Sequence, residues 1–145
     1  MRQLRQSFEY ALIRVVPRVE RGECLNAGVV LFCRPRRFLA ARVSHDRARL
    51  LALAPDLAPD ELDAIDRQLA LIPRLAAGDA AGGQIARLPL HERWHWLVAP
   101  ASTVIQPSPV HTGLCDDPAA ELDDLFATMV LPPAPFPLPA EEDII

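Results

Sequence analysis

The first third of the chain consists of apolar runs separated by short polar breaks. Residues 8–16 are rich in β-branched and aromatic side chains and alternate weakly with polar ones, which is typical of a strand. Within residues 26–33, positions 29–32 are all apolar, as in a strand whose two faces are both covered. The connection at residues 34–36 is short enough for a hairpin into a third strand at 38–43. These segments predict an antiparallel meander.

Helical spacing replaces this pattern after the third strand. Ser44 can cap a short helix that runs through Leu53, with Asp46 near its positive end, and Pro55 stops this helix. A longer helix begins at Pro59, because proline suits the first turn and the apolar residues that follow recur at helical spacing. Pro73 is expected to kink or end this helix. Two helices therefore follow the meander.

The last part of the chain contains the clearest helical pattern. Residues 90–98 suit a short helix, whereas residues 104–110 are extended but interrupted by prolines, so they belong at a sheet edge if they pair. Asp117 can cap the last helix, and Pro118 fits its first position. The apolar stripe of this helix, which we expect to be buried, consists of Leu122, Leu125, Phe126, Met129 and Val130.

Together these elements predict an α+β fold. We expect an antiparallel sheet of three to four strands, built on the N-terminal meander, with helices packed on one face. Residues 1–131 form this single domain, which is long enough to bury a core without disulfides or metals. Residues 132–145 contain five prolines and an acidic stretch at 141–143, a composition that predicts a disordered tail.

Composition narrows the class of protein. No apolar run approaches the roughly 18 residues of a membrane span, and the N-terminal residues lack the apolar core of a signal peptide. The three cysteines form no Cys-x-x-Cys pair, and an odd number suits a reducing compartment. We therefore expect a cytoplasmic protein without a membrane segment.

Charge is distributed unevenly along the chain. Residues 1–50 hold eleven arginines and four acidic residues, whereas residues 51–145 hold four arginines and fifteen acidic residues. One interpretation is a basic face that binds nucleic acid through the arginine-rich half. The other is that the basic half pairs with the acidic half of the same domain. The second is favoured, because the basic half lacks the interleaved aromatic residues of a stacking platform.

Residues 91–95 read His-Glu-Arg-Trp-His and match the H-E-x-x-H pattern. On a helix, His91 and His95 lie one turn apart and can share a zinc ion, while Glu92 can activate the bound water. Glu121 on the next helix could supply a third ligand. This interpretation makes the protein a small metal-dependent hydrolase.

The opposing interpretation of this segment is an exposed amphipathic turn without bound metal. The predicted helix is short, and both Trp94 and Trp96 are expected to anchor it in the core. A second catalytic neighbourhood is His45-Asp46, although a capping turn explains this pair equally well. The sequence leaves these alternatives open.

Several motifs together resemble one protein family. They are Y-A-L-I-R-V-V-P at residues 10–17, R-G-E at 21–23, N-A-G-V-V-L-F at 26–32, S-P at 108–109, H-T-G at 111–113, D-P at 117–118 and L-D-D-L-F at 122–126. Over about residues 7–131 the chain resembles DUF3037, a bacterial family of unknown function. The resemblance implies no particular biochemical activity, because none is established for the family. Some members are encoded beside a HipA-like kinase, which implies a protein partner or a regulatory role.

Four polar residues around the R-G-E motif are the candidate binding residues: Arg14, Glu23, Asn26 and Arg42. In a structural account, Glu23 accepts hydrogen bonds from Arg14, Arg34 or Arg42 and locks the loop to the sheet, while Asn26 satisfies loop backbone groups. In the rival account, Glu23, Asn26 and a nearby arginine line a ligand or partner site. Glu23 is then also a candidate catalytic residue, as Glu92 is in the zinc interpretation.

These observations favour a non-enzymatic interaction or regulatory module with a protein partner, for which a HipA-like kinase is the implied example. The first alternative is a metal-dependent hydrolase that uses His91, Glu92 and His95. The second is nucleic-acid binding by the arginine-rich half, which requires salt-dependent affinity. No cofactor is expected unless the histidines bind zinc.

Overall fold

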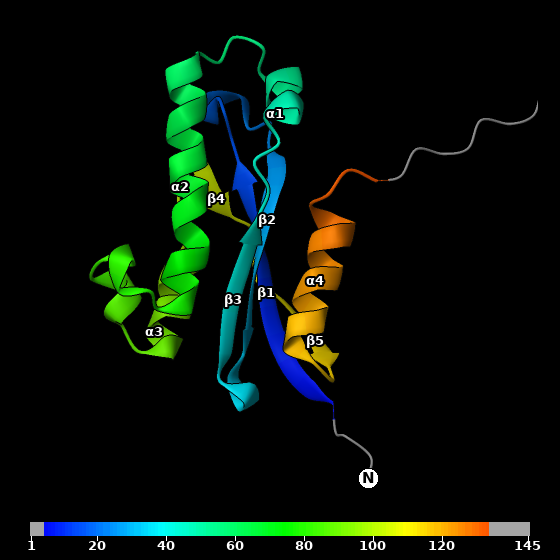
Figure 1. The fold of residues 1–145 in the computed structure, drawn as a ribbon. Coiled ribbons are helices and arrows are strands. Elements are labelled where there is room, and N and C mark those ends of the chain that lie inside the picture. Colours follow the sequence, from blue (N-terminus) through cyan, green and yellow to red (C-terminus); the bar gives the residue numbers. More distant parts are fainter. Residues whose placement is uncertain (1–4, 134–145) are drawn as a thin grey trace, which may run out of the picture.

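The long first strand, β1 (Gln6–Val15), organises the sheet in this computed structural model, which describes residues 5–133 (Figure 1). One edge of β1 pairs with β2 (Leu25–Cys33), which pairs in turn with β3 (Phe38–Val43). The other edge of β1 pairs with β4 (Ile105–Pro107) and, further along, with β5 (His111–Cys115). All of these pairings are antiparallel, and the strand order is β3-β2-β1-β4.

The helices lie on both sides of this sheet. In chain order they are α1 (Arg47–Leu53), α2 (Pro59–Ala77), α3 (Leu90–Leu97) and α4 (Pro118–Met129), with single 3₁₀ turns at Val19–Arg21, Arg34–Arg36, Ala80–Gly82 and Ile85–Arg87. Figure 1 shows α2 and α3 on one side of the sheet and α4 on the other. The α+β fold with an antiparallel sheet is therefore confirmed, whereas the single helical layer predicted from the sequence is wrong.

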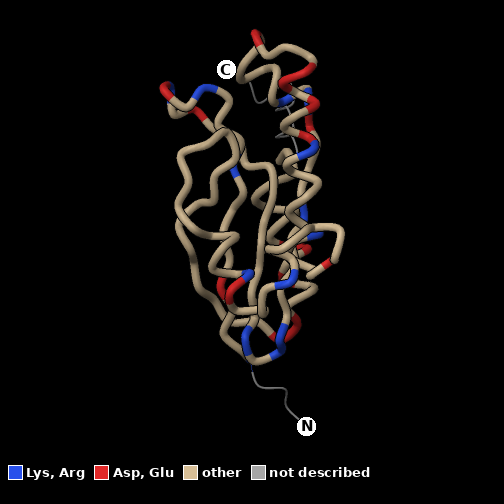
Figure 2. Tube along the Cα trace, turned by 90° about the vertical axis from the view of Figure 1, so that its left-hand side faces the viewer, with Lys and Arg blue, Asp and Glu red and all other residues tan. Residues whose placement is uncertain are grey.

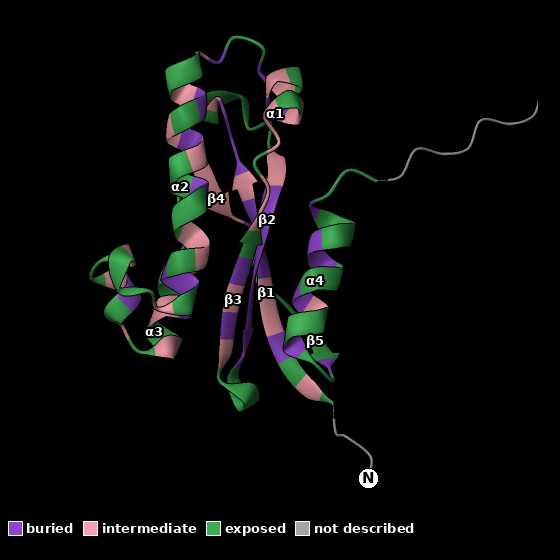
Figure 3. Ribbon diagram, in the orientation of Figure 1, coloured by how far each residue is buried: buried purple, intermediate pink, exposed green. Residues whose placement is uncertain are grey.

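Alternating side chains of β2 explain the two helical layers. Val30 and Phe32 belong to the core under α1, α2 and α3, together with Leu69 and Trp94. Leu31 and its neighbours on the same face belong to a second core under α4. Figure 3 shows β2 buried along most of its length between these layers. The all-apolar run at residues 29–32 thus requires cover on both faces, and α4 supplies the second cover.

Two helix boundaries differ from the expected ones. α1 begins at Arg47 rather than after Ser44, because the Asp46 carboxylate accepts the Arg49 backbone N–H at 3.1 Å and caps the helix. α2 continues through Pro73 to Ala77 and ends at Gly78 with a φ of 73°. Continued burial of the last turn offsets the missing proline N–H, because Leu75 and Ala76 are both buried.

The sheet has five strands, one more than the upper expectation. β5 was not predicted as a strand, and its register places His111 opposite Tyr10 and Cys115 opposite Gln6. Between β4 and β5 the buried Ser108 maintains the contact with β1: its backbone N–H donates to Leu12 O at 2.7 Å and its Oγ accepts from Leu12 N at 2.8 Å. The prolines around Ser108 therefore interrupt the edge strand, while the backbone N–H and C=O of Leu12 both keep a hydrogen-bond partner.

A close approach between β2 and β3 requires Gly28. A Cβ atom at this position would lie 2.7 Å from the Arg42 backbone oxygen and 2.9 Å from Val43 Cγ1. Opposite Gly28, a bulge between Ile13 and Arg14 shifts the β1–β2 register. Asn26 pairs with Arg14 as a result.

Within residues 5–133, no helix combines the length and apolar character needed to cross a membrane. The tail predicted over residues 132–145 lies, from residue 134 onward, outside the described residues.

Candidate functional site

An apolar groove of about 410 Å³ lies between α2, the end of α3 and the edge strand β4. Ile13 and Val30 of the sheet contribute to its lining, as do Leu71 of α2 and Trp96 of α3. Trp96 is 50% exposed and Leu71 is 40% exposed, although both are large apolar side chains. The volume falls in the range of roughly 300–1,000 Å³ that is typical of ligand sites.

The chain that leaves α3 accounts for this groove. After Leu97 the backbone passes through Ala99, Pro100 and Ala101, whose side chains are short. These residues do not fill the space between α2 and β4 as larger side chains would. Apolar surface on both sides of the segment is therefore left accessible.

The polar groups of the groove are uncharged. Gln68 lies on α2, and Thr103 donates its hydroxyl to the Ile105 backbone oxygen at 2.8 Å. Among the described residues that line the groove, none is ionisable. The groove therefore offers apolar contact rather than acid, base or nucleophilic chemistry.

Sequence reasoning missed the exposure of Trp96. Both tryptophans of α3 were expected in the core, yet only Trp94 is buried, where it stacks on Phe32 at 5.5 Å between ring centroids. The sequence contained a signal for this: side chains two residues apart on a helix point about 160° away from each other, so both cannot face one core. Leu71 also falls outside the stripe of buried α2 residues that contains Leu69.

The residues around the R-G-E motif do not form a single site. Arg14 and Asn26 are opposite each other on β1 and β2, and Asn26 Nδ2 donates to the Met129 backbone oxygen at 3.2 Å. Arg49 donates to the Val130 oxygen at 2.8 Å, so both contacts hold the C-terminal end of α4. Arg14 Nε is buried without a hydrogen-bond partner among the described residues.

Glu23 and Arg42 lie apart from this pair. Glu23 accepts a hydrogen bond from Arg21, not from Arg14, Arg34 or Arg42, so the expected lock between loop and sheet is wrong. The physical reason is proximity in the chain: Arg21 lies two residues from Glu23 in the same exposed loop, so its guanidinium contacts the Glu23 carboxylate. Arg42 instead pairs with Asp123 of α4 at 2.8 Å, with its guanidinium 4.3 Å from the centre of the Phe126 ring.

A hollow of about 260 Å³ beside Glu23 is lined by paired charges. Arg18 donates to Asp56 at 2.9 Å and to Glu61 at 3.2 Å. The hydrogen bond from Arg18 is the main reason that the pKa of Asp56 lies below its ordinary value of 3.8. Because these partners satisfy one another, the hollow offers little free charge to a ligand.

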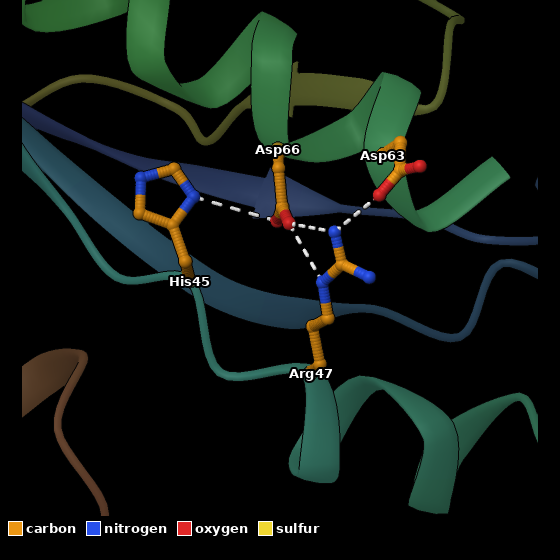
Figure 4. Close-up of polar contacts among 4 residues, drawn as sticks. All are labelled: His45, Arg47, Asp63 and Asp66. Atoms are coloured by element: carbon orange, nitrogen blue, oxygen red, sulfur yellow. Dashed lines mark hydrogen bonds and ion pairs between the residues drawn. The ribbon is translucent and has the colours of Figure 1, made fainter. Parts of the chain in front are cut away.

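Next to His45 and Asp46, the side chain of Arg47 joins α1 to α2 (Figure 4). Arg47 donates to Asp66 at 2.7 Å and to Asp63 at 2.6 Å, while His45 Nδ1 lies 3.4 Å from Asp66 Oδ1, long for a hydrogen bond. The Asp46 carboxylate caps α1 by accepting the Arg49 backbone N–H. The adjoining cavity is only about 10 Å³, the space of roughly one water molecule, and cannot hold a substrate.

The predicted zinc site is incomplete. His91 and His95 meet on α3 with 3.0 Å between their Nε2 atoms, and Glu92 is exposed beside them. Glu121, the expected third ligand, lies on α4 across the sheet. No group of three or more metal-ligating side chains occurs within residues 5–133. The described part of the chain therefore does not assemble the three-ligand hydrolase site.

Arginines of the basic half pair with acids of the acidic half. Arg18 and Arg42 form ion pairs with acidic residues from 51–145, as described above. Arg47 does the same with Asp63 and Asp66. Figure 2 shows basic and acidic residues interspersed along the chain rather than gathered on opposite sides. The intramolecular interpretation of the charge asymmetry is supported, and the arginines available to a nucleic acid are fewer than the sequence suggests.

Comparison with known proteins identifies one family. A family model described as "Protein of unknown function (DUF3037)" matches residues 10–130. No match was found among curated proteins or among solved structures.

Proposed function

The chain belongs to the DUF3037 family, and we propose that it is a non-enzymatic interaction module whose apolar groove binds an apolar segment of a partner protein. The observation that carries this proposal is the exposure of Trp96 and Leu71 at the groove. Tryptophan is enriched among the residues that dominate binding energy, particularly where it fills a desolvated pocket. The uncharged lining favours binding over catalysis.

The proposed partner is a HipA-like kinase, because some members of the family that the chain resembles are encoded beside one. An apolar helix or extended segment of the kinase would cover Trp96 and place the small protein where it can regulate the enzyme. We propose that this occurs in the bacterial cytoplasm, where a reducing environment keeps the three cysteines as free thiols.

Binding should be measured by calorimetry between the full chain and a purified HipA-like kinase from the same organism. Trp96→Ala is expected to weaken binding by roughly 30-fold or more, as the loss of a dominant interface residue does. Since Trp96 is half exposed, the variant should fold, and its circular dichroism spectrum checks this.

Leu114→Ala is the matched control. Leu114 is 62% exposed on β5 and does not line the groove, so its removal tests the loss of an exposed apolar side chain elsewhere. Equal affinity of wild type and Trp96→Ala would refute the groove as the binding site. Absence of binding by the wild type would refute the kinase as the partner.

A further inference from the structure

Two histidines meet on the outer face of α3. His91 and His95 are separated by four positions, which places them on the same side of the helix one turn apart. Their Nε2 atoms lie 3.0 Å apart, their ring planes are almost perpendicular at 89°, and both side chains are exposed. This arrangement is independent of the groove and is not used by the proposed function.

We infer that His91 and His95 form a two-histidine site for a divalent transition metal that prefers Cu²⁺ or Ni²⁺ to Zn²⁺. Imidazole is a good ligand for all three ions. Two such ligands from consecutive helical turns can reach one ion without any change of backbone. Water, or ligands from another molecule, would occupy the other coordination positions.

The separation of the two nitrogens is compatible with this preference. If each nitrogen binds one ion at about 2.0–2.1 Å, a spacing of 3.0 Å gives an angle of roughly 90–100° at the ion. Adjacent positions of a square-planar or tetragonal Cu²⁺ or Ni²⁺ site have this angle. The tetrahedral angle preferred by Zn²⁺ corresponds to a separation of about 3.3 Å.

Packing beneath the pair limits how far the histidines can move. Trp94, between them in the sequence, is buried and stacks on Phe32, which fixes the helix on the sheet. The His91 ring also lies against Phe32, with 6.3 Å between ring centroids. A helix held in this way reduces the conformational freedom that would be lost on metal binding.

The same spacing suits a hydrogen bond between two neutral imidazoles, in which one Nε2–H donates to the other nitrogen. A metal titration distinguishes the two interpretations. The full chain, without a histidine tag and freed of metal by a chelator, is titrated with CuCl₂, NiCl₂ and ZnCl₂ by calorimetry. We expect one saturable Cu²⁺ per chain, with Ni²⁺ bound more tightly than Zn²⁺.

His91→Ala and His95→Ala should each weaken Cu²⁺ binding roughly tenfold or more, because each removes one of two protein ligands. His111→Ala is the control, since His111 is exposed on β5 and lies against Tyr10 instead of a second histidine. Affinity that is unchanged in His91→Ala and His95→Ala would overturn the site. Tighter binding of Zn²⁺ than of Ni²⁺ would overturn the preference drawn from its geometry.

A rise in thermal stability provides a second readout. An ion that joins His91 to His95 binds the folded state preferentially, so saturating Cu²⁺ should raise the melting temperature of the wild type. The rise should be absent in the His91→Ala/His95→Ala double variant. An equal rise in both proteins would show that the ion binds elsewhere and would refute the inference.

Discussion

Ser108 is the only polar or charged residue that is buried within residues 5–133, at 3% exposure. Its hydroxyl accepts the Leu12 N–H and donates to the Pro109 oxygen at 2.9 Å. Ser108→Ala removes the partner of a buried backbone donor while leaving the chain contour unchanged. The free energy of unfolding should fall by about 1–3 kcal/mol, as measured by urea denaturation.

Ser102→Ala is the appropriate comparison for this prediction. Ser102 lies in the connection between α3 and β4 and is exposed, so replacing its side chain should change the free energy of unfolding by less than about 0.5 kcal/mol. Equal stability of the two variants would mean that the Leu12 N–H finds another partner, and that Ser108 does not hold the interrupted edge strand.

At the scale of the element, α4 shows how a few local groups specify a helix. The Asp117 carboxylate accepts the backbone N–H groups of Ala119 at 3.0 Å and Ala120 at 3.4 Å, and Pro118 occupies the first turn. Both roles were predicted from the sequence. Asp117→Ala should lower the free energy of unfolding by about 1 kcal/mol, which chemical denaturation can measure.

The neighbouring Asp116 provides the control for the cap. It is exposed, and its backbone oxygen, not its carboxylate, accepts a hydrogen bond from Arg36. Asp116→Ala removes a negative charge near the same helix end without removing a cap. A loss of stability as large as that of Asp117→Ala would assign the effect to charge rather than to the capping hydrogen bonds.

At the scale of the molecule, one sheet separates two cores that share the same strands. Phe126 lies in the core under α4, whereas Trp94 lies in the core across the sheet. Because β2 contributes alternate side chains to both, neither layer should unfold while the other remains intact. Phe126→Ala should therefore lower the free energy of unfolding by about 3–5 kcal/mol for the whole domain.

Two probes test this cooperativity. Tryptophan fluorescence reports on the α3 side of the sheet, and far-ultraviolet circular dichroism reports on all helices. In urea both transitions should share one midpoint, and Phe126→Ala should shift both by the same amount. A fluorescence transition that stays in place while the dichroism transition moves would show that the two layers unfold separately.

Local chemistry accounts for the parts of the fold that could be predicted. The first three strands, the hairpin at residues 34–36 and the cap of α4 all depend on residues within a few positions of each other. The stripe of α4 was correct at Leu122, Leu125, Phe126 and Val130, all of which are buried, whereas Met129 is 43% exposed. A helical period indicates which residues share a face, but it does not indicate which residues at the margin of that face remain exposed to solvent.

The candidate site was much less predictable, because its residues meet through the fold. The groove combines Ile13 with Leu71, Trp96 and Ile105, which are far apart in the sequence. Arg42 was foreseen as a polar contact, but its partner Asp123 lies 81 positions away. Exposure of Trp96 depends on which side of α3 faces the sheet, and that follows from the packing of Trp94.

The amino-acid order was sufficient for the first three strands, the four helices with their approximate limits, the antiparallel meander and the family, because each follows from short-range periodicity, capping or motifs. Assembly in three dimensions was needed to place α4 opposite α2, to add β5 to β1 and to open the groove. Those outcomes depend on surfaces that must be covered and on backbone groups that must be paired by distant segments. A strand buried on both faces requires two layers, but only the packed molecule shows which helices provide them.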